Sequence, residues 1–353
     1  MKLSYDEKKE KEPILREMWR SIFGDPKRYE DFYYQSMYPQ NQVLTEEWDE
    51  EVVGMIHLNP YVVQVGEASY PLHYIVGVAT LEKCRRQGVM RNMLVRCMKD
   101  MAERGEIFTY LMPADRAYYE PFDFAFIQRF AVETMTGESG KEGLVPLTKE
   151  EFAEASVFLE GFLKEHFGVY TKLGKAYLLQ LREECESEDG ELLILKDAGK
   201  IVGFCCYGQE ETVYVRQIFC QDPDQMKAAI AGYFPGKQIE MTVDGGENGK
   251  GASIMARILR LDLLVPLLKG KKECEFLIGI QDNYLEQQNG NFCFRIGKES
   301  CGIEKTSQIP EKSIGIQDLT KILFGFEHLE LLSRYPDFEA IEPLGPVMIG
   351  EII

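Results

Sequence analysis

Two adjacent arginines and a glycine, Arg85-Arg86-Gln87-Gly88, stand between a β-branched run and a strongly periodic apolar segment. This order predicts a strand, a turn and a helix whose first turn covers residues 85–90. The N–H groups and positive dipole end of a helix start attract anions, and guanidinium groups donate hydrogen bonds to phosphate oxygens. Glycine also lets an anion approach the backbone closely. The passage therefore predicts a pyrophosphate site built from Arg85, Arg86, Gln87, Gly88, Val89 and Met90.

A second feature lies in the preceding strand, where Gly77 interrupts the run Tyr70–Val78. A glycine inside a strand is typical of a β-bulge, which here would separate this strand from the next one, predicted over residues 107–112. The gap would expose backbone groups of Val78 and Thr80 to an extended ligand that carries amides. A pyrophosphate at one end and a peptide-like arm at the other describe coenzyme A, so we expect this ligand.

The motif Arg85-x-x-Gly88-x-Met90 resembles the Arg/Gln-x-x-Gly-x-Gly/Ala motif of the GNAT superfamily of N-acetyltransferases, with Met90 in place of the last small residue. Within it, the Eis (enhanced intracellular survival) family accepts larger residues at that point. The run Tyr119-Glu-Pro-Phe-Asp-Phe124 resembles the segment that carries this family's catalytic tyrosine, with Asp123 in place of a glycine. The resemblance covers the whole chain. It implies an acetyl-CoA-dependent N-acetyltransferase that assembles as a homo-hexamer.

The same resemblance implies the catalytic groups. A primary amine attacks the thioester directly, so one group must take a proton from the ammonium and another must give one to the thiolate. Tyr119 matches the general acid, and the C-terminal carboxylate, here that of Ile353, matches the general base. His73, on the same predicted strand as Val78, is the alternative base and is otherwise a substrate contact or a half-buried strand residue. Cys84, beside the two arginines, leaves an acyl-cysteine route open.

The acceptor is specified less closely by the sequence. Phe23, Asp25 and Tyr33 lie in a predicted helix pair over residues 13–37, which borders the acceptor cleft in this fold. With His73 they are the candidate substrate-binding residues. An acidic, aromatic-lined cleft suits a polyamine or an aminoglycoside, although a solvated face with core aromatics has the same composition. The resemblance implies broad acceptance of primary amines, including lysine side chains.

The elements that must position these residues fall into three predicted regions. For residues 1–136 the resemblance implies a catalytic GNAT domain with a mixed, splayed central sheet. Residues 137–248 repeat the predicted order of helices and strands, and the resemblance implies a second, degenerate GNAT-like domain there. Its counterpart of the phosphate loop, Cys220–Met226, has two aspartates and neither Arg nor Gly, so we expect one acetyl-CoA site per chain. Residues 249–353 resemble sterol carrier proteins, which completes an α+β fold class with tandem GNAT-like domains and an α+β C-terminal domain.

Composition excludes several other classes of protein. The formal net charge of −18 over 353 residues disfavours binding to nucleic acid or to an anionic membrane. No apolar run approaches the roughly 20 residues of a membrane-spanning helix, and the charged start predicts a cytoplasmic protein with reduced cysteines. The scattered histidines and cysteines predict no metal site. A non-catalytic protein that senses acyl-CoA or binds an apolar ligand in its third region remains the alternative function.

Overall fold

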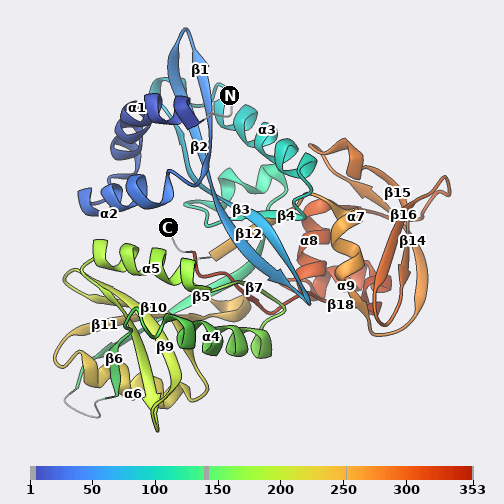
Figure 1. Ribbon diagram of the computed structural model, residues 1–353. Coiled ribbons are helices and arrows are strands. Elements are labelled where there is room, and N and C mark those ends of the chain that lie inside the picture. The colour runs from blue at the N-terminus through green and yellow to red at the C-terminus, as the bar shows by residue number, and fades with distance from the viewer. Residues whose placement is uncertain (1–4, 139–142, 252, 352–353) are drawn as a thin grey trace.

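The computed structural model describes residues 5–138, 143–251 and 253–351. Within these residues, 13 strands form one mixed sheet in the order β19-β7-β2-β3-β4-β12-β5-β11-β10-β9-β8-β6, and β1 pairs with β2 beside this path. Figure 1 shows an N-terminal lobe in blue to cyan, a second lobe in green to yellow and a C-terminal lobe in orange to red. The predicted α+β class and the large mixed sheet are confirmed.

The N-terminal lobe has helices on both faces of its strands. Alternate residues of the central strands face opposite helices: Met55 and Val76 belong to the same core as Trp19, while Ile56 and Ile75 belong to the core that contains Met93. The elements are α1 (Tyr5–Phe23), α2 (Lys27–Phe32), α3 (Val89–Glu103), β1 (Gln42–Trp48), β2 (Glu51–Val65), β3 (Ala68–Thr80), β4 (Phe108–Leu111) and β5 (Ala125–Thr136). A π-helical turn, Tyr33–Met37, continues α2.

Helix α3 has the predicted apolar face but begins later than predicted. Residues 85–88 form a turn before the helix, in which Arg86 has a φ of 61° and Gly88 a φ of 86°. Gly88 is the N-cap, and its left-handed conformation favours glycine. The buried face of the helix carries Val89, Met93, Leu94, Cys97, Met98, Met101 and Ala102.

Strand β2 is continuous over 15 residues, although it contains Pro60. Along one edge, β2 pairs with β1 over Glu51–Leu58 and with β7 (Val169–Thr171) over Val63–Val65. Pro60 lies between these two ladders, where no described strand on that edge requires the N–H that proline lacks. The strand therefore accommodates the proline without losing a ladder hydrogen bond there.

The predicted bulge is present in β3. The pairing with β2 shifts register so that Gly77 and Val78 lie together opposite Ile56. Gly77 has a φ of 59°, and a Cβ atom there would lie 2.6 Å from the ring of Trp19, so the position requires glycine on both counts. On its other side β3 runs parallel to β4 but pairs with it only at Tyr74 among the described residues. The two strands therefore separate beyond Tyr74, as predicted.

The second lobe contains α4 (Phe152–His166), α5 (Lys175–Ser187), α6 (Pro223–Tyr233), β6 (Leu144–Pro146), β7, β8 (Glu191–Asp197), β9 (Lys200–Gln209), β10 (Val213–Cys220) and β11 (Gln238–Asp244). Strands β10 and β11 are parallel, pair over Val213–Val215 and then separate, with α6 between them in sequence. Strand β10 also has an irregularity beside Gln217, whose φ is 51°. This repeats the bulge and splay of β3 and β4, which favours the predicted duplication.

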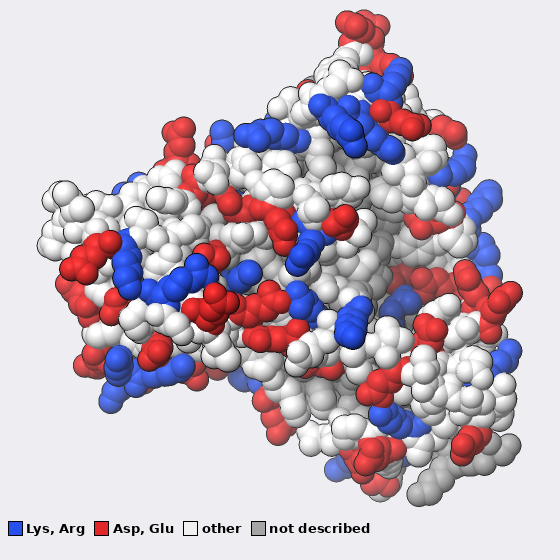
Figure 2. Space-filling model, turned by 180° about the vertical axis from the view of Figure 1, so that it is seen from behind, with Lys and Arg blue, Asp and Glu red and all other residues white. Residues whose placement is uncertain are grey.

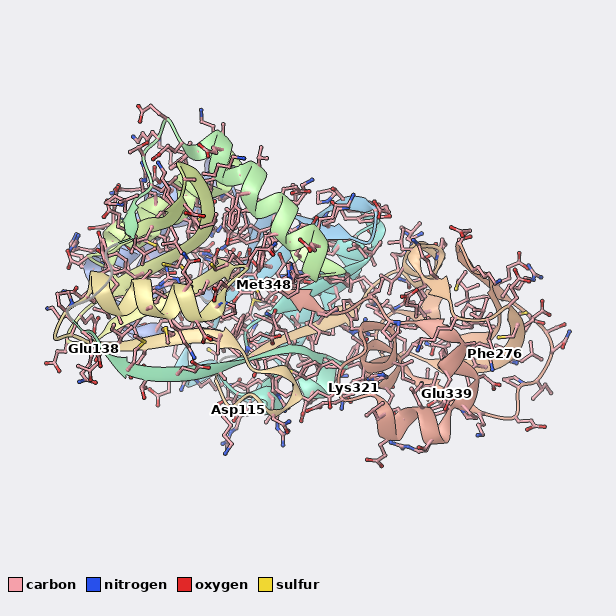
Figure 3. All side chains as sticks on the ribbon, turned by 90° about the horizontal axis from the view of Figure 1, so that it is seen from below. Asp115, Glu138, Phe276, Lys321, Glu339 and Met348 are labelled. Atoms are coloured by element: carbon pink, nitrogen blue, oxygen red, sulfur yellow. The ribbon has the colours of Figure 1, made fainter. Side chains whose placement is uncertain are left out.

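Strand β5 connects the two halves of the sheet. Its residues 125–129 pair with β12 (Ser253–Ile258), and its residues 130–136 pair with β11. Strand β12, which the sequence analysis assigned to the C-terminal region, therefore lies between β4 and β5. In Figure 3, Glu138 after β5 and Phe276 of the C-terminal lobe lie at opposite ends of the molecule.

The C-terminal lobe consists of a four-stranded sheet, a two-stranded sheet and short helices. A hairpin joins β14 and β15, with residues 282–289 as its connection. Asn289 closes this loop with its side chain, which accepts from the N–H of Asp282 and donates to its carbonyl. The elements are α7 (Leu261–Leu264), α8 (Ile316–Phe324), α9 (Leu329–Arg334), β13 (Lys269–Gly270), β14 (Cys274–Gln281), β15 (Gly290–Ile296), β16 (Cys301–Lys305), β17 (Ser313–Gly315) and β18 (Ile341–Glu342). The last strand, β19 (Val347–Met348), pairs with β7 in the main sheet.

Candidate active site

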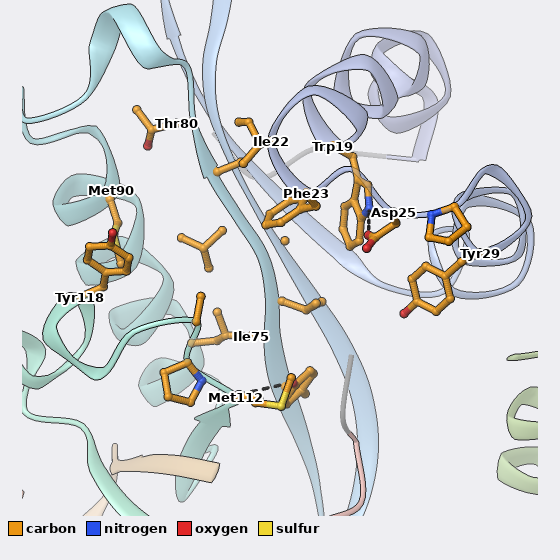
Figure 4. Close-up of a pocket in the computed structure, with 18 of the residues that line it drawn as sticks. Trp19, Ile22, Phe23, Asp25, Tyr29, Ile75, Thr80, Met90, Met112 and Tyr118 are labelled. Carbon is orange, nitrogen blue, oxygen red and sulfur yellow. Dashed lines mark hydrogen bonds between the residues drawn. The ribbon is translucent and has the colours of Figure 1, made fainter. Parts of the chain in front are cut away.

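A cavity of about 1350 Å³ opens along the splayed edge of β3. Its walls are the end of α1 and the start of α2, the strand segment Tyr74–Thr80, the start of α3, the loop after β4 and loops of the second lobe. Figure 4 shows Asp25 and Tyr29 on one side of β3, and Met90 and Tyr118 on the other. The cavity therefore extends from the first turn of α3 across β3 to the junction of the first two lobes.

The α3 end of the cavity offers donors for an anion. The first hydrogen bond of the helix runs from Asn92 N to Gly88 O, so the N–H groups of residues 89–91 are not used within the helix. A Cβ atom on Gly88 would meet no atom within 4 Å, so the backbone there faces open space. Three arginines line this end: Arg85, Arg86 and Arg91. The positive charge of the three arginines and the N–H groups at the helix start both suit a pyrophosphate.

Most of the predicted coenzyme A residues come together around the cavity. Val78 and Thr80 line it from β3, where the separation from β4 leaves an edge that an amide-bearing arm can pair with. Gln87 does not line it, because its side-chain amide turns back and donates to the carbonyl of Lys83 at 2.9 Å. The predicted residues that line the cavity are Val78, Thr80, Arg85, Arg86, Gly88, Val89 and Met90.

Tyr119 lines the cavity from a turn between two short 3-10 segments, Arg116–Tyr118 and Glu120–Phe122. Its ring is 8% exposed and packs edge-on against Phe124, with 6.0 Å between ring centroids. Burial raises the pKa of its phenol to about 12. The phenol therefore carries its proton throughout the neutral range, as a general acid requires.

Two of the predicted acceptor contacts, Phe23 and Asp25, line the cavity. The Asp25 carboxylate accepts a hydrogen bond from the Trp19 indole at 2.7 Å, which fixes its position in the wall (Figure 4). Tyr33, the third predicted acceptor contact, does not line the cavity. Its side chain is fully buried, stacks on Trp19 and donates to Asn59 at 2.9 Å. Tyr33 therefore supports Trp19, which does line the cavity.

The two alternative catalytic residues have different surroundings. His73, predicted as alternative base or substrate contact, lies outside the cavity lining. Its Nδ1 lies 2.9 Å from a Glu106 carboxylate oxygen and its Nε2 lies 3.0 Å from the Gln42 amide. Cys84 does line the cavity, but it is 6% exposed and packs in the same core cluster as Val89. The thiol that an acyl-cysteine route would use is therefore mostly buried.

The second lobe contributes residues that the sequence analysis missed. The loop after α5 brings Glu188 and Asp189 to the cavity, and the connection from β9 to β10 brings Glu210. Arg28 of α2 holds this junction, since its guanidinium pairs with Asp189 and donates to the Glu186 carbonyl at 2.8 Å. No local pattern marks these residues, because only the docking of the two lobes places them at the cavity. The second lobe also brings Arg216, which pairs with Glu188 at 2.7 Å, so its three carboxylates and one guanidinium add net negative charge to the acceptor side.

The C-terminal tail is packed as predicted, as far as the structure describes it. The N–H of Ile349 donates to the Gln128 side chain at 2.9 Å, and the carbonyl of Gly350 accepts from Gln217 at 3.2 Å. Glu351 is 3% exposed and accepts from Thr171 at 2.9 Å. The predicted base, Ile353, lies outside the described residues.

The buried end of the tail lies beneath the cavity. The charge of Glu351 acts on the phenols of Tyr61 and Tyr110. Their rings lie 6.4 Å and 5.4 Å from the ring of Tyr74, which lines the cavity floor. Burial also raises the pKa of the Glu351 carboxyl to about 7. The described chain therefore ends about one layer of aromatic side chains away from the cavity.

Residues 6–127 match the sequence model of the acetyltransferase (GNAT) domain. This segment is a GNAT acetyltransferase domain. It contains the splayed strand, the arginine turn and Tyr119, and the match confirms the predicted enzyme class, an N-acetyltransferase. Acetyl-CoA is the acyl donor of this class. A search of curated proteins gives no match to this sequence.

Solved structures share the fold of nearly the whole chain. A probable N-acyltransferase from Enterococcus faecalis aligns with a TM-score of 0.77 and 16% identity, over 97% of this chain and 93% of that one. A GCN5-related N-acetyltransferase from Anabaena variabilis aligns with a TM-score of 0.76 and 14% identity, over 96% and 97%. Eis1 from Mycobacterium abscessus aligns with a TM-score of 0.66 and 13% identity, over 98% and 93%. At these identities the similarity concerns the fold.

The described part of the chain has neither a membrane-spanning helix nor a metal-binding cluster of side chains. None of its helices combines the length and apolar character that a bilayer span requires. It has no group of three or more His, Cys, Asp or Glu side chains arranged to hold a metal ion.

On the face shown in Figure 2, lysines and arginines are interspersed with aspartates and glutamates.

Proposed function

We propose that this protein transfers the acetyl group of acetyl-CoA to a primary amine, either of a small cationic acceptor of aminoglycoside or polyamine type or of a lysine side chain. One observation carries the proposal: a single cavity joins an arginine-lined helix start to a wall that contains Asp25, Glu188 and Glu210. The first end suits the diphosphate of the donor, and the second suits a cationic amine. The splayed edge of β3 lies between them.

The reaction forms a bond from the amine nitrogen to the acetyl carbon and breaks the bond from that carbon to sulfur. Two proton transfers need a protein group: the ammonium loses one proton before attack, which makes the nitrogen nucleophilic, and the departing thiolate gains one. The nitrogen loses a second proton after its bond to the acetyl carbon has formed, so one proton per turnover is released to the solvent. We assign the transfer to the thiolate to Tyr119, whose phenol is protonated and lines the cavity. We assign the transfer from the ammonium to the C-terminal carboxylate of Ile353. The packing of residues 346–351 towards the cavity floor supports this assignment.

The proposal also includes the finer family assignment. The overall fold match to Eis1 and the order of helices and strands in this chain support an Eis-like enzyme with a degenerate second GNAT-like domain and a sterol carrier protein-like C-terminal domain. We further propose a homo-oligomer, a hexamer by that resemblance. Sedimentation equilibrium of the full chain tests the assembly, and a monomer would refute it.

The function is tested by release of the free coenzyme A thiol from acetyl-CoA in the presence of spermidine, kanamycin and a lysine-containing peptide. Release with at least one amine is expected. Tyr119→Phe should lower kcat while leaving the KM for acetyl-CoA nearly unchanged. Tyr335→Phe is the matched control, because the Tyr335 hydroxyl binds the Ser313 carbonyl within the C-terminal lobe. Tight coenzyme A binding without release by any amine would favour the non-catalytic alternative.

The assignment of the base has its own test. A variant lengthened by one glycine after Ile353 displaces the terminal carboxylate without removing any side chain. We expect it to fold and to bind coenzyme A, but to lose most of its turnover. Full activity of the lengthened chain would refute the role of the carboxylate and leave the assignment of Tyr119 unaffected.

A further inference from the structure

The turn that carries Tyr119 is held by hydrogen bonds from β12 and from the C-terminal lobe. The hydroxyl of Tyr284 donates to the carbonyl of Pro121 at 2.6 Å. Arg257 Nε donates to the carbonyl of Phe122 at 2.8 Å. The Gln317 side chain, on α8, donates to the carbonyl of Phe124 at 2.7 Å. Three backbone carbonyls within four residues of the turn are thus bound by side chains more than 130 positions away in the sequence.

Arg257 is itself rigidly placed. Its side chain is fully buried, and its guanidinium forms an ion pair with the buried carboxylate of Asp282. Asp282 also accepts from the N–H groups of Tyr284 and Leu285 and from the side chain of Gln288. A buried charge needs a partner and satisfied hydrogen bonds to be tolerated, and this network provides both.

The same arginine explains an unusual residue in the turn. Asp123 has a φ of 64°, a left-handed conformation in which glycine is favoured and aspartate is tolerated. Its carboxylate lies 3.7 Å from Arg257 Nη2. The turn therefore has a conformation that a non-glycine residue disfavours, and Arg257 of β12 lies near the Asp123 carboxylate, although burial still raises the pKa of Asp123.

Hydrogen bonds within this turn also fix the backbone of Tyr119. The N–H groups of Phe122 and Phe124 both donate to the Tyr119 carbonyl, at 2.9 and 3.4 Å. The carbonyls of the same two residues are bound by Arg257 and Gln317. The turn is therefore bound from both sides, to Tyr119 and to the C-terminal lobe, so a shift of the lobe contacts would move the phenol.

We propose that the C-terminal lobe and the strand β12 that leads into it position Tyr119 for catalysis, with Arg257, Tyr284 and Gln317 as positioning residues. This inference rests on the proposed function of Tyr119 as general acid. The lobe does not contact the reacting groups; it sets where the phenol lies in the cavity. Proton transfer is sensitive to small displacements of the donor, so the effect should be on turnover rather than on donor binding.

The test uses Tyr284→Phe in the full chain, because it removes only the hydroxyl that binds Pro121. The ring is kept, and with it the contact with Arg91, whose guanidinium lies 5.5 Å from the Tyr284 centroid. We expect kcat for acetyl-CoA with the fastest of the three amines to fall about fivefold, the rate equivalent of one ordinary hydrogen bond. The KM for acetyl-CoA should stay unchanged. Gln317→Leu should behave in the same way, and Tyr335→Phe is again the control.

A double-mutant cycle separates positioning from general stability. In the Tyr119→Phe background, Tyr284→Phe should have almost no further effect on kcat, because the group that it positions is gone. An undiminished effect in that background would overturn the inference, as would an unchanged kcat in both lobe variants. If Tyr119→Phe alone leaves kcat unchanged, the assignment of Tyr119 as general acid and the inference fail, while acetyl transfer stands. If the unmodified protein turns over no amine, the proposed function fails and the inference with it.

Discussion

Replacing Glu351 by glutamine tests whether the tail is buried as the structure shows. Glu351 is 3% exposed, and burial raises its pKa from 4.5 to about 7. The folded protein therefore binds this proton more tightly than the unfolded chain does, and the carboxyl stabilises the fold fully only below about pH 4.5. That contribution is lost as the pH rises through 7. Its upper limit is about 3 kcal/mol, at roughly 1.4 kcal/mol per pKa unit.

Glutamine cannot ionise but can still accept from Thr171, as the carboxyl oxygen does at 2.9 Å. Relative to the unmodified protein, Glu351→Gln should therefore gain free energy of unfolding between pH 5 and pH 8.5, up to that limit. Urea unfolding at a series of pH values measures the difference. Glu286→Gln, at an exposed position, is the control and should show little pH dependence. The same difference at both ends of the pH range for Glu351→Gln would refute the burial of its charge.

Three other perturbations have definite expected outcomes. Gly77→Ala should lower the melting temperature and weaken coenzyme A binding, because the added Cβ atom would lie 2.6 Å from Trp19 on a left-handed backbone. A melting temperature equal to that of the unmodified protein would contradict the bulge. Coenzyme A should raise the melting temperature of the unmodified protein, and Arg85→Ala should reduce that rise, as measured by differential scanning fluorimetry; an undiminished rise would remove Arg85 from the site. Since Tyr119 has a pKa of about 12, its ionisation should not reduce kcat up to about pH 10, and a loss near pH 9 that Tyr119→Phe abolishes would contradict its burial.

The C-terminal lobe is part of the first domain's architecture rather than an appendage to it. Strand β12 lies between β4 and β5. It also carries Arg257, which binds the turn after Tyr119. Removal of residues beyond 249 would therefore take a strand out of the central sheet and leave the turn without its partners. We expect such a truncation to be insoluble.

The sequence by itself determined the local features of the site. A glycine within a β-branched run predicted the bulge in β3, because few other residues adopt its φ of 59°. Arginines before an amphipathic helix predicted the anion-binding turn, since local backbone geometry and charge are sufficient for it. The burial periodicity of α3 likewise follows from spacing alone.

Only the tertiary structure decided which residues share the cavity. Tyr33 and Asp25 are close in sequence, but Tyr33 packs into the core while Asp25 lines the cavity. Glu188 reaches the site only through docking of the second lobe, and Arg257 reaches the Tyr119 turn only because β12 inserts into a distant sheet. Such long-range pairings depend on the packing of whole lobes, and no local spacing encodes them.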